Sequence, residues 1–164
     1  MKTPLWLAQA ASIECLTPLM EIERSGQQHP WTEGQMLDSM RSGHQVETVH
    51  AQPNGSPMVG FWVGMQGVDE VHLLNIAVHP QWRQQGVARF MLHRLAAWAL
   101  QQQAQAIWLE VRVSNQRAIE VYRTAGFEEI AVRPRYYPVN MNQREDAIIM
   151  QAHPSRLFAR EDEA

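Results

Sequence analysis

The sequence of 164 residues contains a single cysteine, Cys15. An intrachain disulfide is therefore excluded, and so is a zinc site built from several cysteines. No apolar run approaches the roughly 18 residues that a membrane helix needs. The first residues also lack the long apolar core of a signal peptide. These absences favour a cytoplasmic protein that acts without a membrane partner.

Charge of one sign is also scarce, since 14 basic residues face 17 acidic ones and the net charge is −3. Nucleic-acid-binding domains are usually markedly basic, so no direct nucleic-acid partner is expected. An acidic protein can still bind an anion through backbone N–H groups, and it attracts basic partners.

Apolar residues make up 45% of the chain and include six tryptophans, which is enough for a packed core. The length suits one domain, which we expect over residues 1–153. A polar, frayed tail is expected over residues 154–164.

Hydrophobic periodicity predicts one mixed α/β domain with strands and helices in the order β-α-α-β-β-β-α-β-α-β-β. Strands are expected at residues 4–10, 44–51, 59–65, 70–79, 106–113, 127–132 and 145–151, and helices at 13–24, from about 32, at 86–103 and at 115–125. Thr32 and Gln35 have the spacing of a capping box. Ser114-Asn115 suits the start of the helix at 115–125, and Gly126 suits its end. Residues 53–57 are a dense turn signal.

The most informative segment is residues 79–89, HPQWRQQGVAR, which joins a predicted buried strand to an amphipathic helix. Gly86 would let backbone approach a ligand closely, and the free N–H groups at the start of the helix suit a phosphate. The simpler interpretation is a strand–helix turn that requires glycine. The three glycines of a dinucleotide-binding fingerprint and the Gly-Lys-Ser/Thr of a P-loop are both absent.

Two further residues have both a catalytic and a structural interpretation. Glu110 lies in a predicted strand on the face opposite the apolar side chains, where it could be a general base or a surface carboxylate paired with Arg112. Tyr122 lies on the last predicted helix, where it could be a proton donor or a half-buried core aromatic. The pattern alone does not choose between these alternatives.

Other catalytic and metal patterns are missing. The seven histidines include no His-Glu-x-x-His and no pair at helical i,i+4 spacing, so no metal site is expected. No Gly-x-Ser-x-Gly nucleophile elbow occurs. We expect Cys15 to be a small buried residue without a catalytic role.

Two motifs together resemble those of the GNAT superfamily of acetyl-CoA-dependent N-acetyltransferases. They are a pyrophosphate-type turn, Arg83-x-x-Gly86-x-Ala88, and a helix signature, Asn115…Ala118…Tyr122…Gly126-Phe127. The segments HPWTEGQM, NIAV, LEVRVSN and RPRYYP…REDAIIM are also similar to the bacterial ribosomal-protein alanine N-acetyltransferases of the RimI type, over most of residues 29–152. The resemblance implies the α/β GNAT fold, a mixed central sheet of about seven strands flanked by about four helices.

The same resemblance implies roles for individual residues. Glu110 would be the proton acceptor, Tyr122 the proton donor, and the Val78 N–H a donor to the oxyanion. Acetyl-CoA, as co-substrate, would be bound by Ile76, Ala77, Val78, Gln84, Gln85, Gly86, Val87, Ala88, Arg89 and Asn115. No metal is implied.

The implied reaction acetylates the N-terminal alanine of a small-subunit ribosomal protein, whose basic N-terminal segment would be the partner. The acidic Glu21, Glu23 and Glu33 would attract such a segment. Two alternatives stay open: a GNAT enzyme for another protein N-terminus or a small amine, and an acyl-CoA-binding sensor without catalysis. The presence of both Glu110 and Tyr122 favours catalysis.

Overall fold

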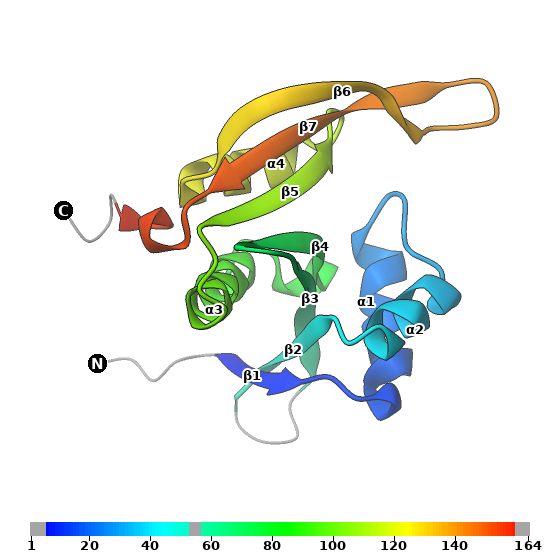
Figure 1. Ribbon diagram of the computed structural model, residues 1–164. Coiled ribbons are helices and arrows are strands. Elements are labelled where there is room, and N and C mark those ends of the chain that lie inside the picture. The colour runs from blue at the N-terminus through cyan, green and yellow to red at the C-terminus, as the bar shows by residue number, and fades with distance from the viewer. Residues whose placement is uncertain (1–5, 53–56, 160–164) are drawn as a thin grey trace. The chain divides into compact units, whose positions relative to one another are not determined.

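The computed structural model describes residues 6–52 and 57–159, which belong to two compact units (Figure 1). Unit 1 is built from residues before 66 together with residues 74–91, and unit 2 from residues 66–73 and those from 92 onwards. Strand β4 (Glu70–Val78) and helix α3 (Val87–Gln101) each contribute residues to both units.

Unit 1 contains an antiparallel run of three strands and two helices that share one apolar core. The strands are β1 (Trp6–Ala10), β2 (Gln45–Ala51) and β3 (Met58–Gln66), and the helices are α1 (Leu16–Gly26) and α2 (Glu33–Arg41). The buried side chains that pack together are Leu19, Met20, Ile22, Met36, Val46, Met58, Phe61, Val63 and Ala77. This core holds α1 and α2 together beside the strands.

Two local features of unit 1 fix where its elements begin and meet. The predicted capping box at the start of α2 is confirmed, since Gln35 N donates to Thr32 Oγ1 (3.1 Å) and Thr32 N to Gln35 Oε1 (2.8 Å). In β3, a Cβ on Gly60 would lie 2.8 Å from the Ala77 carbonyl oxygen. Only glycine therefore lets β3 approach the end of β4 this closely.

Unit 2 contains β5 (Ala106–Arg112), α4 (Gln116–Ala125), β6 (Glu128–Pro138) and β7 (Arg144–Ala152). Residues 70–73 of β4 run parallel to β5, and β7 lies antiparallel between β5 and β6. The described strands form a seven-stranded sheet in the order β1-β2-β3-β4-β5-β7-β6, and with the four α-helices this is the predicted mixed α/β fold.

Strand β6 is longer than the sequence pattern predicts. The predicted strand ends at residue 132, but β6 continues to Pro138 even though Pro134 has no N–H to donate to a ladder. It can do so because β6 is at the edge of the sheet, and because its register shifts between Arg133 and Tyr137. Figure 1 shows the resulting long β6–β7 hairpin beside β5.

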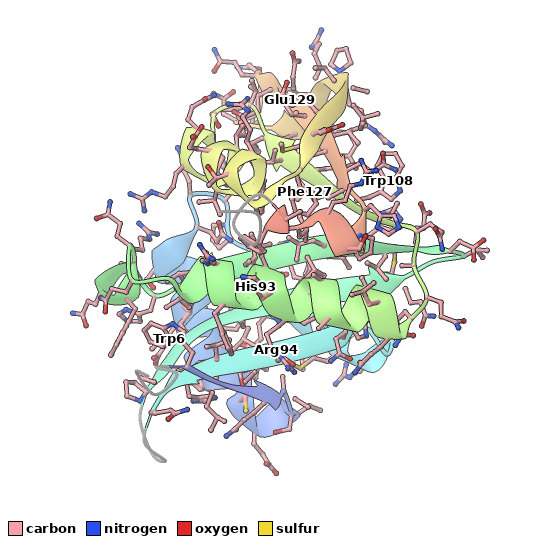
Figure 2. All side chains as sticks on the ribbon, turned by 90° about the vertical axis from the view of Figure 1, so that its left-hand side faces the viewer. Trp6, His93, Arg94, Trp108, Phe127 and Glu129 are labelled. Carbon is pink, nitrogen blue, oxygen red and sulfur yellow. The ribbon has the colours of Figure 1, made fainter. Side chains whose placement is uncertain are left out.

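The residues after β7 correct another expectation. Leu157 and Phe158 are buried, and Phe158 N donates to the Ala125 carbonyl (2.8 Å) at the end of α4. The Phe158 ring stacks on His93, a side chain of α3 (Figure 2), at 3.9 Å between centroids. The expectation of a frayed tail is thus wrong for these residues, because two apolar side chains outweigh their polar neighbours. Residues 160–164, and the turn predicted at 53–57 apart from Pro57, lie outside the described ranges.

Candidate functional site

In unit 1, the candidate residues lie at the junction of β4 and α3. The last residue of β4, Val78, is followed by His79, whose N–H donates to the Val59 carbonyl of β3 (2.8 Å). A single 3-10 turn (Pro80–Trp82) follows, and His79 Nδ1 accepts from Gln81 N (3.1 Å). These bonds fix the path of the chain where it leaves the sheet.

The next residues form the predicted anion-binding turn. Gln84 and Gly86 both have positive φ, at 60° and 89°. These two left-handed residues shape the turn before α3 begins at Val87, and the Phe90 N–H donates to the Gly86 carbonyl (2.9 Å). Residues 84–86 are exposed, and a Cβ on Gly86 would have nothing within 4 Å.

This geometry fits a pyrophosphate. The first N–H groups of a helix have no partner within the helix, and the helix dipole makes that end positive. At α3 these groups follow an exposed turn, with open space beside Gly86. Arg83 turns away from it, because its Nη2 donates to the Gly26 carbonyl (2.8 Å). Anion binding here would therefore depend chiefly on backbone groups, as the sequence predicts.

In unit 2, Glu110 lies in the middle of β5 opposite Ile149 of β7. Its carboxylate accepts a hydrogen bond from the Tyr136 hydroxyl, and its Oε1 lies 3.5 Å from Arg133 Nη2. The Glu110 side chain is 31% exposed. This carboxylate is therefore positioned by two β6 side chains and still open to solvent or substrate.

The expected pairing of Glu110 with Arg112 is wrong, because Arg112 has other partners. Arg112 instead approaches Glu145 of β7 (3.7 Å) and donates to the Pro138 carbonyl (2.9 Å). Its guanidinium also lies over the Tyr137 ring, 4.5 Å from the centroid. Arg112 thus holds the β6–β7 hairpin, and the partner of Glu110 comes from β6.

A bulge in β6 presents these hairpin side chains. Between Arg133 and Tyr137, β6 uses two more residues than β7 does over the same stretch. Arg135 takes the left-handed conformation (φ 52°) at this point, and its N–H donates to Asp146 Oδ1 (2.9 Å). Such bulges redirect side chains. Sequence reasoning missed the roles of Arg133, Tyr136 and Tyr137, although the RPRYYP segment had been noticed.

All three tyrosines of the chain lie in unit 2 and have raised pKa values. Burial, followed by the charge of Tyr137, raises the pKa of Tyr122 far above its ordinary value. Burial, followed by the charge of Glu110, raises the pKa of Tyr137 to about 12. The hydrogen bond to Glu110 raises the pKa of Tyr136. All three phenols therefore keep their protons to a higher pH than a free tyrosine does.

Asn115 caps α4 as predicted, since its Oδ1 accepts from Ala118 N (3.3 Å). The cap uses the carbonyl end of an exposed side chain, so the amide end is the part that could contact a cofactor. Gly126 ends the same helix in the left-handed conformation (φ 118°), also as predicted.

Three further expectations concern charge, metals and membranes. Glu21 and Glu33 are exposed, but Glu23 is fully buried and cannot attract a peptide at the surface. Within residues 6–52 and 57–159, no group of three or more His, Cys, Asp or Glu could hold a metal ion. None of the described helices has the length and apolarity needed to cross a membrane.

The β4–α3 turn, the capped α4 and the sheet order define an acetyltransferase of the GNAT class. The model of the acetyltransferase (GNAT) family matches residues 16–127, and the chain belongs to this family. It is therefore an acetyl-CoA-dependent N-acetyltransferase.

Within this family, the chain is similar to several named proteins. The chain is 36% identical over 129 residues to the [ribosomal protein bS18]-alanine N-acetyltransferase of Escherichia coli K12, covering 79% of this chain and 84% of the relative. It is 33% identical over 132 residues to the protein of that name from Haemophilus ducreyi, which covers 80% of this chain and 89% of the relative. The crystal structure of the E. coli ribosomal-protein-S18-alanine N-acetyltransferase matches with a TM-score of 0.79 at 32% identity, over 90% of this chain and 93% of that one.

The raised tyrosine pKa values predict an unusual alkaline titration. A phenol with its ordinary pKa of 10.0 is half ionised at pH 10, whereas here little tyrosinate should form below that pH. Folding raises these pKa values, so the protonated tyrosines contribute to the free energy of unfolding. That contribution is complete below pH 10 and is lost as the pH rises towards about 12. Ultraviolet absorbance of tyrosinate in folded and urea-unfolded protein measures the difference. Coincident titration curves would contradict the prediction.

Proposed function

We propose that the protein transfers acetyl from acetyl-CoA to the N-terminal alanine of a small-subunit ribosomal protein, in the cytoplasm. The observation that carries the chemistry is Glu110, a partly exposed carboxylate on a strand, held by Tyr136 and Arg133. The choice of acceptor is supported by the two bS18-alanine N-acetyltransferases that share 36% and 33% identity with the chain.

The proposal assigns cofactor binding to backbone groups. The exposed turn and the first N–H groups of α3, over residues 84–89, would hold the pyrophosphate, and Arg89 is an exposed cation in that stretch. Backbone groups of residues 76–78 would bind along the cofactor, and the Asn115 amide would contact it. Bound acetyl-CoA supplies an acetyl group already activated as a thioester.

Proton transfer is assigned to two side chains of unit 2. An α-amine has a pKa of about 7.7–8.0, so much of it is protonated at neutral pH and cannot attack. Glu110 would accept that proton, directly or through a water molecule. The Val78 N–H would donate to the oxygen that gains charge in the transition state. The Tyr122 hydroxyl would donate to the sulfur as the thiolate leaves.

An N-terminal amine suits this apparatus better than a lysine. The reference pKa of a lysine is about 10.4, so a smaller fraction of it is neutral at pH 7. A basic segment after the first residue would be attracted by the net charge of −3 and by the exposed Glu21 and Glu33. Arg24 lies 3.9 Å from Glu33 and would reduce this attraction.

The assignment of the turn predicts that Gly86→Glu abolishes acetyl-CoA binding in a folded protein. The added carboxylate would project into the open space beside the turn and repel the pyrophosphate. Gly86→Ala is the matched control, because it carries the same strain at positive φ without the charge, and it should bind more tightly than Gly86→Glu. Calorimetry with acetyl-CoA measures both. Equal affinity for folded Gly86→Glu and wild type would refute the assignment.

The assignment of the base predicts that Glu110→Gln lowers kcat by on the order of 10²–10⁴-fold at neutral pH. Higher pH should partly restore the rate, because more of the amine is then already neutral. Tyr122→Phe should also lower kcat with little change in acetyl-CoA affinity. Glu120→Gln, which removes an exposed carboxylate of α4, is the control and should leave the rate unchanged. Wild-type turnover by Glu110→Gln at neutral pH would show that Glu110 is only a hairpin contact.

The choice of acceptor predicts where the acetyl group goes. A peptide that begins with alanine and continues with basic residues should receive one acetyl group, on its free α-amine, and the rate should fall with added salt. The same peptide with a blocked N-terminus, and a blocked peptide with internal lysines, should react far more slowly. Mass spectrometry locates the acetyl group. Faster modification of the internal lysines would assign the chain a different acceptor class.

A further inference from the structure

Glu23, on α1, is fully buried in unit 1 although its side chain is ionisable. Asn75 Nδ2 donates a hydrogen bond to its Oε2, and the Trp31 N–H and the Gln27 side chain contribute weaker ones. No donor among the described residues reaches Oε1 in hydrogen-bonding geometry. A buried carboxyl group with an unsatisfied oxygen is rare and requires an explanation. The reaction scheme above does not use it.

The partners of Glu23 connect three parts of unit 1. Gln27 Nε2 donates to Asn75 Oδ1 (3.1 Å) and to the Ile76 carbonyl (2.9 Å). Glu23 on α1, Gln27 and Trp31 in the segment that follows, and Asn75 on β4 therefore form one network. It ends on the backbone of Ile76, one of the residues assigned to acetyl-CoA.

A second contact keeps α1 close to β4. At the end of α1, a Cβ on Gly26 would lie 3.1 Å from the Val78 carbonyl oxygen, so the helix end and the strand end nearly touch. The Gly26 carbonyl accepts from Arg83 of the turn. The end of α1 is thus fixed to both ends of the β4–α3 junction.

The network matters more to the segment after α1 than to β4. Strand β4 is paired with β3, and the His79–Val59 bond holds its end without any help from Glu23. By contrast, the hydrogen bonds that residues 27–31 make in the described structure all go to Glu23, Asn75 or Ile76. Without the network, this segment would keep only the backbone bond from Gln27 N to the Glu23 carbonyl and the packing of Trp31 on the core, so its path beside β4 would be less tightly fixed.

We propose that Glu23 is a positioning residue: through Asn75, Gln27 and Trp31 it holds residues 27–32 against the end of β4, and so fixes the acceptor side of the reaction. The last step rests on the proposed function, because it takes the HPWTEGQM segment as the acceptor side. The role depends on the hydrogen bond that Glu23 accepts, and a neutral acceptor in its place would serve as well.

The pH dependence of stability distinguishes the hydrogen bond that Glu23 accepts from the cost of burying its negative charge. Burial raises the pKa of Glu23 above its ordinary 4.5 and outweighs the neighbouring donors, which lower it. A raised pKa means that the stability this group contributes is complete below pH 4.5 and is lost as pH rises through the folded-state value. Glu23→Gln removes that loss, so at neutral pH it should be at least as stable as wild type.

The test compares Glu23→Ala and Glu23→Gln with Glu14→Ala, which removes an exposed carboxylate from the 3-10 turn (Ile13–Cys15) that precedes α1. Gln27→Ala breaks the network while leaving the buried carboxyl group and its bond to Asn75 in place, and serves if Glu23→Ala does not fold. Four quantities are measured for each folded variant: hydrogen exchange of residues 27–32, KM for the alanine peptide, kcat, and Kd for acetyl-CoA.

Glu23→Ala and Gln27→Ala should speed exchange in residues 27–32 and raise KM for the peptide roughly tenfold, because small misplacements are costly to a reaction. Kd for acetyl-CoA should change less than twofold, since the turn is held independently. Glu23→Gln and Glu14→Ala should match wild type. A change in melting temperature alone, or a Glu23→Gln variant as impaired as Glu23→Ala, would overturn the proposal. If wild type does not acetylate the peptide, the proposed acceptor is wrong, and hydrogen exchange still decides whether Glu23 positions the segment.

Discussion

One constraint on the structure concerns the backbone between β4 and α3. This stretch has to be held firmly while the N–H groups at the start of the helix stay available, so that they could bind an anion. Between Val78 and Val87 the chain leaves the sheet, takes the left-handed conformation at Gln84 and Gly86, and starts α3, whose first N–H groups have no partner within the helix. If these amides bind the pyrophosphate as proposed, a turn that is already held in place lowers the cost of ordering them on binding. The bond from His79 to β3 and the reach of Arg83 to α1 supply that rigidity from outside the turn.

The candidate functional groups of unit 2 are side chains, whereas those of unit 1 are mainly backbone N–H groups. Glu110 is presented by a central strand, which is stiff, and its partners by the edge strand β6, which bulges. Arg133 and Tyr136 give the carboxylate two donors of different kinds, one charged and one neutral. Under the proposed function, a substrate ammonium that reaches Glu110 would meet a carboxylate that already has these partners. Arg133, whose side chain is 54% exposed, is the partner with more freedom to give way.

Local patterns allowed the sequence to predict most of the elements. The capping box at Thr32, the cap at Asn115 and the stop at Gly126 are each decided by a few neighbouring residues, and all three are confirmed. The mixed α/β class and the family were also predictable, because each of the two family motifs, the turn at 83–88 and the helix signature at 115–127, is a short stretch of neighbouring residues. The partner of Glu110 was not, since it depends on the register of β6 against β7, which shifts at Arg135. The buried Glu23 has the same explanation: its partner Asn75 is 52 residues away and no pattern joins the two. The assignments of Glu110, Tyr122 and the turn remain predictions.

The docking of Phe158 has a practical consequence for handling the protein. Its N–H covers the carbonyl of Ala125 at the end of α4, and its ring lies on His93 of α3. A truncation placed directly after β7 would uncover one face of the His93 imidazole and leave the Ala125 carbonyl without its partner. Tags and fusion partners belong beyond Phe158, and a protease that nicks the chain near His153 would produce a less soluble product than its small loss of mass implies.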